Sequence, residues 1–310
     1  MPPSPFDQQQ LPTGDGHSLY VAQFGKPDGQ PAVVLHGGPG SGTQPSVLDW
    51  FDLTRQRVVL FDQRGSGRSL PQGEIANNDS PRLVADIELI REQLGIARWM
   101  VVGGSWGATL ALLYAGQHAE RISAMVLRGS FLASERELHW FFQSLRAMVP
   151  QGWSRMTADW SDAQKSRVLN TLCEALLQGD ASQASDAARR WNDYENAVMN
   201  AMAGKLDETP ASPTDVPSRV LNKYRLQAHY LSNACFCSEV DLMAAAGRLR
   251  ETPVTLVHGT HDFVCPPENA VWLKQAMPHA VLNWVKNGGH TPADPGIASA
   301  LRTSIIGTHT

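Results

Sequence analysis

A five-residue stretch of the chain has the pattern of an activated serine. The sequence GGSWG at residues 103–107 matches G-x-S-x-G, and it lies between an apolar run and a helical pattern over residues 108–115. In such a strand, turn and helix the serine occupies a strained turn that exposes its hydroxyl, and small flanking residues let the two elements approach closely. The pattern alone arises by chance in roughly one chain in ten of this length. Its context therefore carries the prediction that Ser105 is a nucleophile.

A serine of this kind needs two partners. A base must remove the hydroxyl proton, and an acid must hold the tautomer of the base. Where the serine follows a strand in this way, the partners come on loops after late strands, the acid before the histidine. Asp262 follows the apolar run 254–257, and His290 follows the run 281–285. His261 is the nearest competitor, but it adjoins the acid and follows the wrong strand. We therefore predict Asp262 as the acid and His290 as the base.

Acyl transfer also requires donors for the developing oxyanion, which are usually backbone N–H groups preset by glycine-rich turns. The sequence HGGPG at residues 36–40 follows the apolar run 32–35 and supplies such a turn. We predict the N–H groups of Gly38 and Trp106 as the donors. A simple Gly-Pro turn is the alternative. A phosphate-binding loop fits less well, because Pro39 lacks a donor and no helix begins directly after it.

The elements that must position these residues follow an alternating pattern. Short apolar runs alternate with helical patterns in both the first and the last part of the chain, which predicts an α/β fold, a mostly parallel sheet with helices on both faces. Between them, residues 130–247 show no convincing strand and read as a helical insertion. We expect a catalytic domain of residues 1–129 and 248–310 and a cap domain of residues 130–247. The expected strands lie at residues 32–35, 58–61, 100–102, 124–127, 254–257 and 281–285.

Composition excludes several classes of protein. The 26 Lys and Arg against 30 Asp and Glu give a net charge of 26 − 30 = −4, so the chain has no general attraction for nucleic acid or an anionic membrane. The N-terminal sequence MPPSPFDQQQ lacks the basic and apolar regions of a secretory signal. Four cysteines are too few and too irregularly spaced for a disulfide framework. We predict a cytoplasmic protein without nucleic-acid or membrane partners.

Four motifs together resemble one known family. HGGPG (36–40), DQRGSGRS (62–69), GGSWG (103–107) and RGSF (128–131) are similar to the motifs of the proline iminopeptidases, serine peptidases of the α/β-hydrolase fold. The resemblance is close over about residues 30–142 and returns at the acid and histidine loops. It implies an α/β-hydrolase sheet with an inserted helical cap over the active site. It also implies release of an N-terminal proline from small peptides or amides through an acyl-enzyme, with no metal or organic cofactor.

The resemblance further implies two substrate-binding positions in the cap. An aminopeptidase must recognise a charged amino group, and the family uses acidic cap residues for this. Glu195, in WNDYE at residues 191–195, matches one of them. At the second, RLQAHYL at residues 225–231 has Gln227 where the family has glutamate and Leu231 where it has an aromatic residue. Gln227 weakens the attraction for an ammonium group but can still accept a hydrogen bond.

This departure leaves alternatives open. A carboxylesterase or amino-acid amidase on the same fold is the second hypothesis, and a ligand-binding protein with low turnover is the third. The expected partner is a small peptide, amide or ester, and the sequence does not indicate an oligomeric state. Cys265 stands where the family often has a cysteine. Its thiol could make the enzyme sensitive to mercurials, or it could be a small buried residue.

Overall fold

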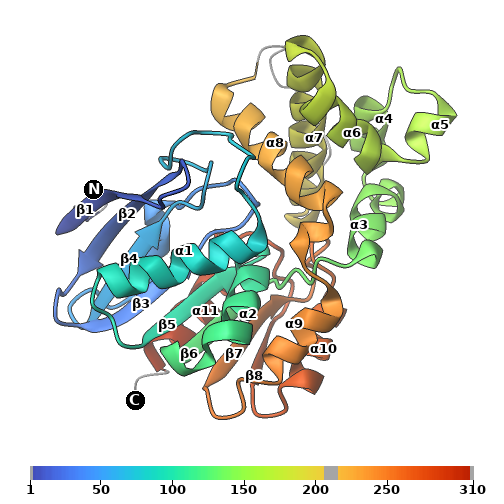
Figure 1. The fold of residues 1–310 in the computed structure, drawn as a ribbon. Coiled ribbons are helices and arrows are strands. Elements are labelled where there is room, and N and C mark those ends of the chain that lie inside the picture. Colours follow the sequence, from blue (N-terminus) through green and yellow to red (C-terminus); the bar gives the residue numbers. More distant parts are fainter. Residues whose placement is uncertain (1–2, 206–215, 308–310) are drawn as a thin grey trace.

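An eight-stranded sheet forms the centre of the computed structural model, which describes residues 3–205 and 216–307 (Figure 1). The strand order is β1-β2-β4-β3-β5-β6-β7-β8. β1 pairs with β2 and β2 with β4 in antiparallel register, and all the other neighbours are parallel. The strands are β1 (Asp7–Pro12), β2 (Ser18–Gly25), β3 (Gln30–Leu35), β4 (Gln56–Phe61), β5 (Trp99–Gly104), β6 (Ile122–Arg128), β7 (Val254–Gly259) and β8 (Val281–Val285).

Both faces of this sheet are covered by helices. Successive side chains of a strand point to opposite faces, so Val33 of β3 enters one core cluster and Val34 the other. The first cluster packs under α1 (Ser80–Gln93), α2 (Trp106–His118), α9 (Glu239–Ala246) and α10 (Glu268–Ala276). The second packs under α11 (Pro295–Gly307) and the 3₁₀ helix η1 (Pro45–Trp50). The predicted α/β sheet with helices on both faces is confirmed.

The antiparallel β1–β2 hairpin was not predicted from the sequence. β1 has the sequence DQQQLP, and only Leu11 of its residues is buried. An edge strand with so little buried surface has no apolar run that would reveal it. By contrast, α1 has a local start signal: the side chain of Asp79 accepts a hydrogen bond from the N–H of Arg82 (2.9 Å), and Pro81 occupies the first turn.

Helices and 3₁₀ turns make up the segment between β6 and β7, and its described residues contain no strand. The helices α6 (Val168–Gln178), α7 (Ala181–Met202) and α8 (Ser218–Ser232) enclose a separate core cluster that includes Trp191, Tyr194 and Tyr224. α9 instead packs against α2, and its Leu242 belongs to the core under the sheet. The division into domains at residues 130 and 247 stays a prediction. The other helices of the segment are α3 (Glu135–Phe142), α4 (Pro150–Met156) and α5 (Asp162–Lys165). The 3₁₀ helix η2 (Ala119–Arg121) precedes β6, and η3 (Ser144–Ala147) and η4 (Ala234–Phe236) lie within the segment.

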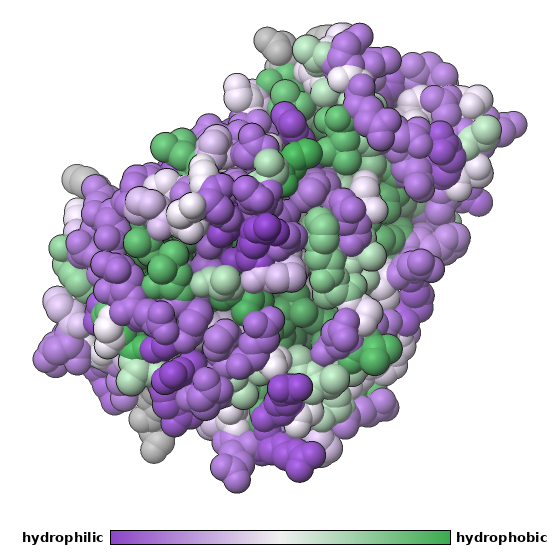
Figure 2. Space-filling view, viewed as in Figure 1, coloured by the Kyte–Doolittle hydropathy of each residue, from purple (hydrophilic) through white to green (hydrophobic). Residues whose placement is uncertain are grey.

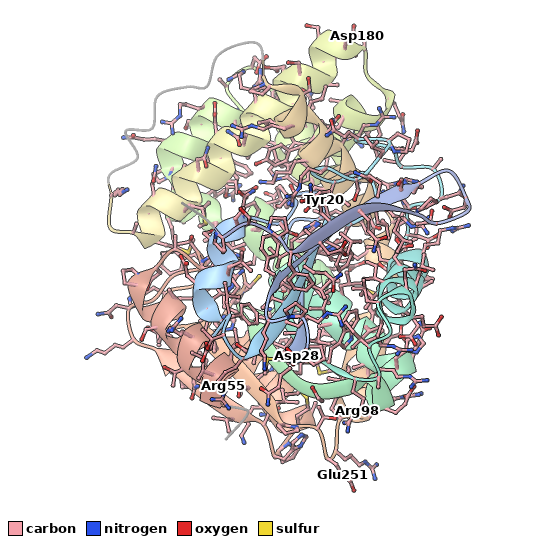
Figure 3. The ribbon with its side chains drawn as sticks, turned by 90° about the vertical axis from the view of Figure 1, so that its left-hand side faces the viewer. Tyr20, Asp28, Arg55, Arg98, Asp180 and Glu251 are labelled. Atoms are coloured by element: carbon pink, nitrogen blue, oxygen red, sulfur yellow. The ribbon has the colours of Figure 1, made fainter. Side chains whose placement is uncertain are left out.

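The carboxyl ends of the parallel strands face the helical segment. Arg98 and Glu251, which precede β5 and β7, lie at one end of the molecule, whereas Asp180, which precedes α7, lies at the other (Figure 3). Figure 2 shows a mostly hydrophilic face. Some of its hydrophobic side chains gather where the helical segment meets the sheet. No helix in the described part of the chain has the length and apolar character needed to cross a membrane.

Candidate active site

Ser105 lies in the turn between β5 and α2 with a strained backbone. Its φ of 57° and ψ of −123° fall in a region that costs a non-glycine residue about 1–3 kcal/mol. Its N–H donates to the carbonyl of Arg128 (2.9 Å), which holds the turn against β6. A Cβ on Gly107 would lie 2.0 Å from the carbonyl oxygen of Leu35, and a Cβ on Gly103 would lie 2.3 Å from that of Gly107. Glycine at both positions therefore lets the strand and the helix meet.

His290 and Asp262 form a hydrogen-bonded pair. Nδ1 of His290 lies 2.8 Å from Oδ2 of Asp262, and the other oxygen of Asp262 accepts from the N–H groups of Val264 (3.0 Å) and Cys265 (2.9 Å). Burial by itself raises the pKa of Asp262, but the charge and hydrogen bond of His290 outweigh it and hold the pKa below its usual range. The carboxylate is therefore ionised and accepts a hydrogen bond from the Nδ1–H group of the imidazole.

Ser105 and His290 line the same cavity, which has a volume of about 290 Å³. A larger cavity of about 560 Å³ shares Gly37, Arg128 and Pro292 with it, but Ser105 and His290 do not line the larger one. The smaller cavity is therefore the candidate active site. Its walls are mainly apolar and come from the helical segment and neighbouring loops: Phe131, Leu138, Phe141, Phe142, Trp191, Met199, Leu231 and Val264.

The predicted oxyanion donors belong to the glycine-rich turn after β3 and to the start of α2. Trp106 is the first residue of α2, where backbone N–H groups lack partners within the helix. Gly37 and Gly38 line the cavity, and a Cβ on Gly37 would lie 3.6 Å from Cβ of Ser105. Gly38 has a φ of +121°, which favours glycine. The role of Gly38 and Trp106 stays a prediction, and this placement is compatible with it.

Hydrogen bonds of Gln63 connect three of the sequence motifs. The N–H of Gln63 donates to Nε2 of His36 (2.9 Å), so Nδ1 of His36 carries the proton and donates to the carbonyl of Gly37 (2.9 Å). The side-chain amide of Gln63 donates to the carbonyl of His36 (2.8 Å) and accepts from Nε1 of Trp106 (2.9 Å). These contacts connect the glycine-rich turn to α2.

Sequence reasoning missed two residues beside the pair. Nε2 of His258 lies 3.7 Å from Oδ2 of Asp262 and 3.0 Å from the carbonyl oxygen of Cys265. Burial lowers the pKa of His258. Arg128 is buried and donates to the carbonyl of His290 (2.5 Å). Both stand at or near the carboxyl end of a strand, which is the one signal that could have indicated them. The competitor His261 is exposed.

Cys265 is a buried thiol at the wall of the cavity. Burial raises its pKa well above the usual value, and a hydrogen bond with the Ser105 hydroxyl offsets only part of that rise. Cys265 is therefore present as a thiol rather than a thiolate at neutral pH. Among the described residues, no group of three or more His, Cys, Asp or Glu side chains could hold a metal ion.

The two predicted substrate-binding residues both line the cavity. The carboxylate of Glu195 accepts from Nζ of Lys223 (3.0 and 3.2 Å) and from the hydroxyl of Tyr224 (2.8 Å). Gln227 donates through Nε2 to the carbonyl of Gly38 (3.1 Å). Its Oε1 is buried and has no hydrogen-bond partner in the part of the chain that the structure describes. The Lys223 contact was not predicted, because it joins two different helices.

The comparison with known proteins agrees with this geometry. The family described as "alpha/beta hydrolase fold" matches residues 31–295. A proline iminopeptidase of Xylella fastidiosa (strain Temecula1 / ATCC 700964) is 38% identical over 300 residues, which cover 96% of this chain and 95% of that protein. The chain belongs to the proline iminopeptidase family of α/β-hydrolases. The resemblance inferred from the motifs is thereby confirmed, and the protein is a hydrolase.

Other proline iminopeptidases and related proteins also match this chain in sequence or in structure. The proline iminopeptidase of Neisseria gonorrhoeae is 34% identical over 304 residues, covering 97% of this chain and 96% of that protein. Among solved structures, a proline iminopeptidase-related protein from Thermus thermophilus has a TM-score of 0.61 at 21% identity, with 97% of each chain covered. The proline iminopeptidase of Mycobacterium smegmatis has a TM-score of 0.61 at 19% identity and covers 98% of each chain. These two structures support the fold alone.

Proposed function

We propose that this member of the family is a serine hydrolase that uses Ser105, His290 and Asp262 as its catalytic triad. Ser105 attacks the acyl carbon, and His290 first removes the hydroxyl proton and then delivers it to the leaving group. Asp262 orients the imidazole, and the N–H groups of Gly38 and Trp106 stabilise the oxyanion. The single observation that carries the proposal is the 2.8 Å hydrogen bond between His290 and Asp262, with His290 lining the same cavity as the strained Ser105.

The proposed reaction is release of an N-terminal proline from small peptides or amides through an acyl-enzyme. The names of the relatives support this substrate, and the small apolar cavity is compatible with a prolyl ring. In this proposal Glu195 faces the substrate nitrogen and Gln227 offers Oε1 as a second acceptor. We further propose a cytoplasmic location, which is compatible with four free cysteines.

A carboxylesterase or amino-acid amidase is the second candidate. Two observations favour it: Gln227 replaces a carboxylate, and Glu195 is already paired with Lys223. Both reduce the attraction of the cavity for a substrate ammonium group.

One experiment tests the proposed function against this alternative. The purified protein is incubated with prolyl 4-nitroanilide and with 4-nitrophenyl butyrate, and a fluorophosphonate probe is used to label the nucleophile. We expect turnover of the prolyl arylamide and labelling at Ser105. Turnover of the ester alone would favour the esterase, and absence of labelling at Ser105 would exclude the serine mechanism.

The pH dependence of the reaction is a further prediction. The pKa of Asp262 lies below its usual range, so its charge is present above that depressed pKa and is lost only when the pH falls through it. We therefore expect Asp262 to stay charged at about pH 4, where an ordinary aspartate takes up its proton. With an uncharged arylamide, protonation of Asp262 should therefore not add to the decrease of log(kcat/KM) at acid pH, and the slope should not reach two at about pH 4. A slope of two at about pH 4 would contradict the depressed pKa of Asp262.

A further inference from the structure

The charge environment of the cavity depends on one carboxylate. Glu137 also lines the cavity, but its carboxylate already accepts from the N–H groups of Leu132 and Ser134 and from the amide of Asn269. Arg128 supplies a positive charge. Glu195 is therefore the carboxylate to which a substrate nitrogen would bind.

Glu195 already holds an ammonium group that belongs to the protein. Nζ of Lys223, on α8, lies 3.0 and 3.2 Å from its two oxygens, and Tyr224 donates to one of them at 2.8 Å. The Lys223 ammonium also lies 4.6 Å from the centre of the Tyr224 ring, a cation–π contact that further fixes its position. The side chains of Lys223 and Glu195 are 23% and 28% exposed, so solvent screens the pair only in part. The ion pair cancels most of the negative field that Glu195 would present to a substrate.

We propose that Lys223 is a specificity-determining residue, which pairs with Glu195 and thereby lowers the preference of the cavity for acyl groups bearing a protonated amine over uncharged acyl groups. This inference rests on the proposed function of the same site. Gln227 supports it from the next turn of α8, because its buried Oε1 is an acceptor without charge and without a partner among the described residues. A neutral N–H on the substrate can also donate to this oxygen, so Gln227 does not require a charged amine.

Three substrates of nearly equal shape test the proposal. The 4-nitroanilides of proline, 5-oxoproline and cyclopentanecarboxylic acid share a five-membered ring and a leaving group. The ring carries a protonated amine in the first, a neutral N–H in the second and no nitrogen in the third. The measured quantity is the ratio of kcat/KM for the prolyl substrate to kcat/KM for each uncharged one.

Lys223→Met removes the ammonium and keeps the apolar length of the side chain. We expect it to raise the ratio of prolyl to cyclopentanecarbonyl turnover by about tenfold or more, because Glu195 then binds the substrate amine without competition. Arg225→Met is the matched control: it removes the same charge from an exposed position on the same helix and should change the ratio by less than about twofold. In Lys223→Met/Glu195→Gln the gain should disappear.

Other outcomes overturn the proposal. A lower ratio in Lys223→Met would mean that Lys223 positions Glu195 for the substrate, and an unchanged ratio would mean that the pair does not affect recognition. Lys223→Gln, which is also uncharged but keeps a donor for Glu195, repeats the test if the methionine variant is unstable.

A binding measurement separates this proposal from the proposed function. Calorimetry in the Ser105→Ala background compares prolinamide with cyclopentanecarboxamide, with and without Lys223→Met, and needs no turnover. The expected result is a gain of about tenfold in affinity for prolinamide alone. If wild-type protein hydrolyses none of the three arylamides but the binding preference shifts as expected, only the proposed function fails. If hydrolysis occurs and the preference does not shift, only the role of Lys223 fails.

Discussion

Ser105→Ala is expected to lower kcat by about four to six orders of magnitude, because removal of the nucleophile leaves only binding and oxyanion stabilisation. KM should change little, since the other residues that line the cavity are untouched. The measurement is burst and steady-state kinetics on prolyl 4-nitroanilide, together with loss of fluorophosphonate labelling. Turnover within tenfold of wild type would remove Ser105 from the mechanism.

The backbone strain at Ser105 supplies a matched control for folding. Alanine at this position must adopt the same positive φ of 57°, whereas glycine reaches it at little steric cost. Ser105→Gly should therefore be more stable than Ser105→Ala, by about 1 kcal/mol in the free energy of unfolding. Both variants should be equally inactive, so a difference in stability cannot explain the loss of kcat. Equal stability of the two would contradict the strained turn.

Asp262→Asn is expected to lower kcat by about 10⁴-fold, and the surrounding hydrogen bonds give the reason. The N–H groups of Val264 and Cys265 donate to one carboxylate oxygen, so the amide of an asparagine would place its own oxygen there. Its NH₂ group would then face Nδ1 of His290, and two donors cannot pair. The imidazole must therefore carry its proton on Nε2, where it cannot accept the proton of the Ser105 hydroxyl.

The tautomer itself can be measured. In ¹⁵N NMR spectra near neutral pH, wild-type His290 should be protonated at Nδ1 and the Asp262→Asn variant at Nε2. Thermal unfolding serves as the control for a general loss of structure. A variant that keeps kcat within tenfold of wild type, or that keeps the Nδ1 tautomer, would show that Asp262 does not orient the base.

The sequence alone was sufficient to predict the fold class and the order of the candidate catalytic groups, because both depend on local patterns. Apolar runs of strand length, alternating with helical periods, report burial between helices. In GGSWG the need for glycine is local, because the turn brings residues 103 and 107 together. A Cβ on Gly103 would lie only 2.3 Å from the carbonyl oxygen of Gly107. Asp262 and His290 follow strands, so their position at one edge of the sheet follows from the parallel order.

Tertiary packing decided the chemistry of the substrate side. Glu195 and Lys223 are separated by 28 residues, and only the packing of α7 against α8 brings an ammonium group to that carboxylate. From the sequence, Gln227 indicates only the loss of a negative charge. In the structure its amide also donates to the carbonyl of Gly38, 189 residues away. The same holds for His258 and Arg128, which reach the histidine–aspartate pair from β7 and β6. Helical spacing identifies the face of a helix that is buried, but the side chain met there depends on the angle and register of two packed helices, which no local pattern encodes.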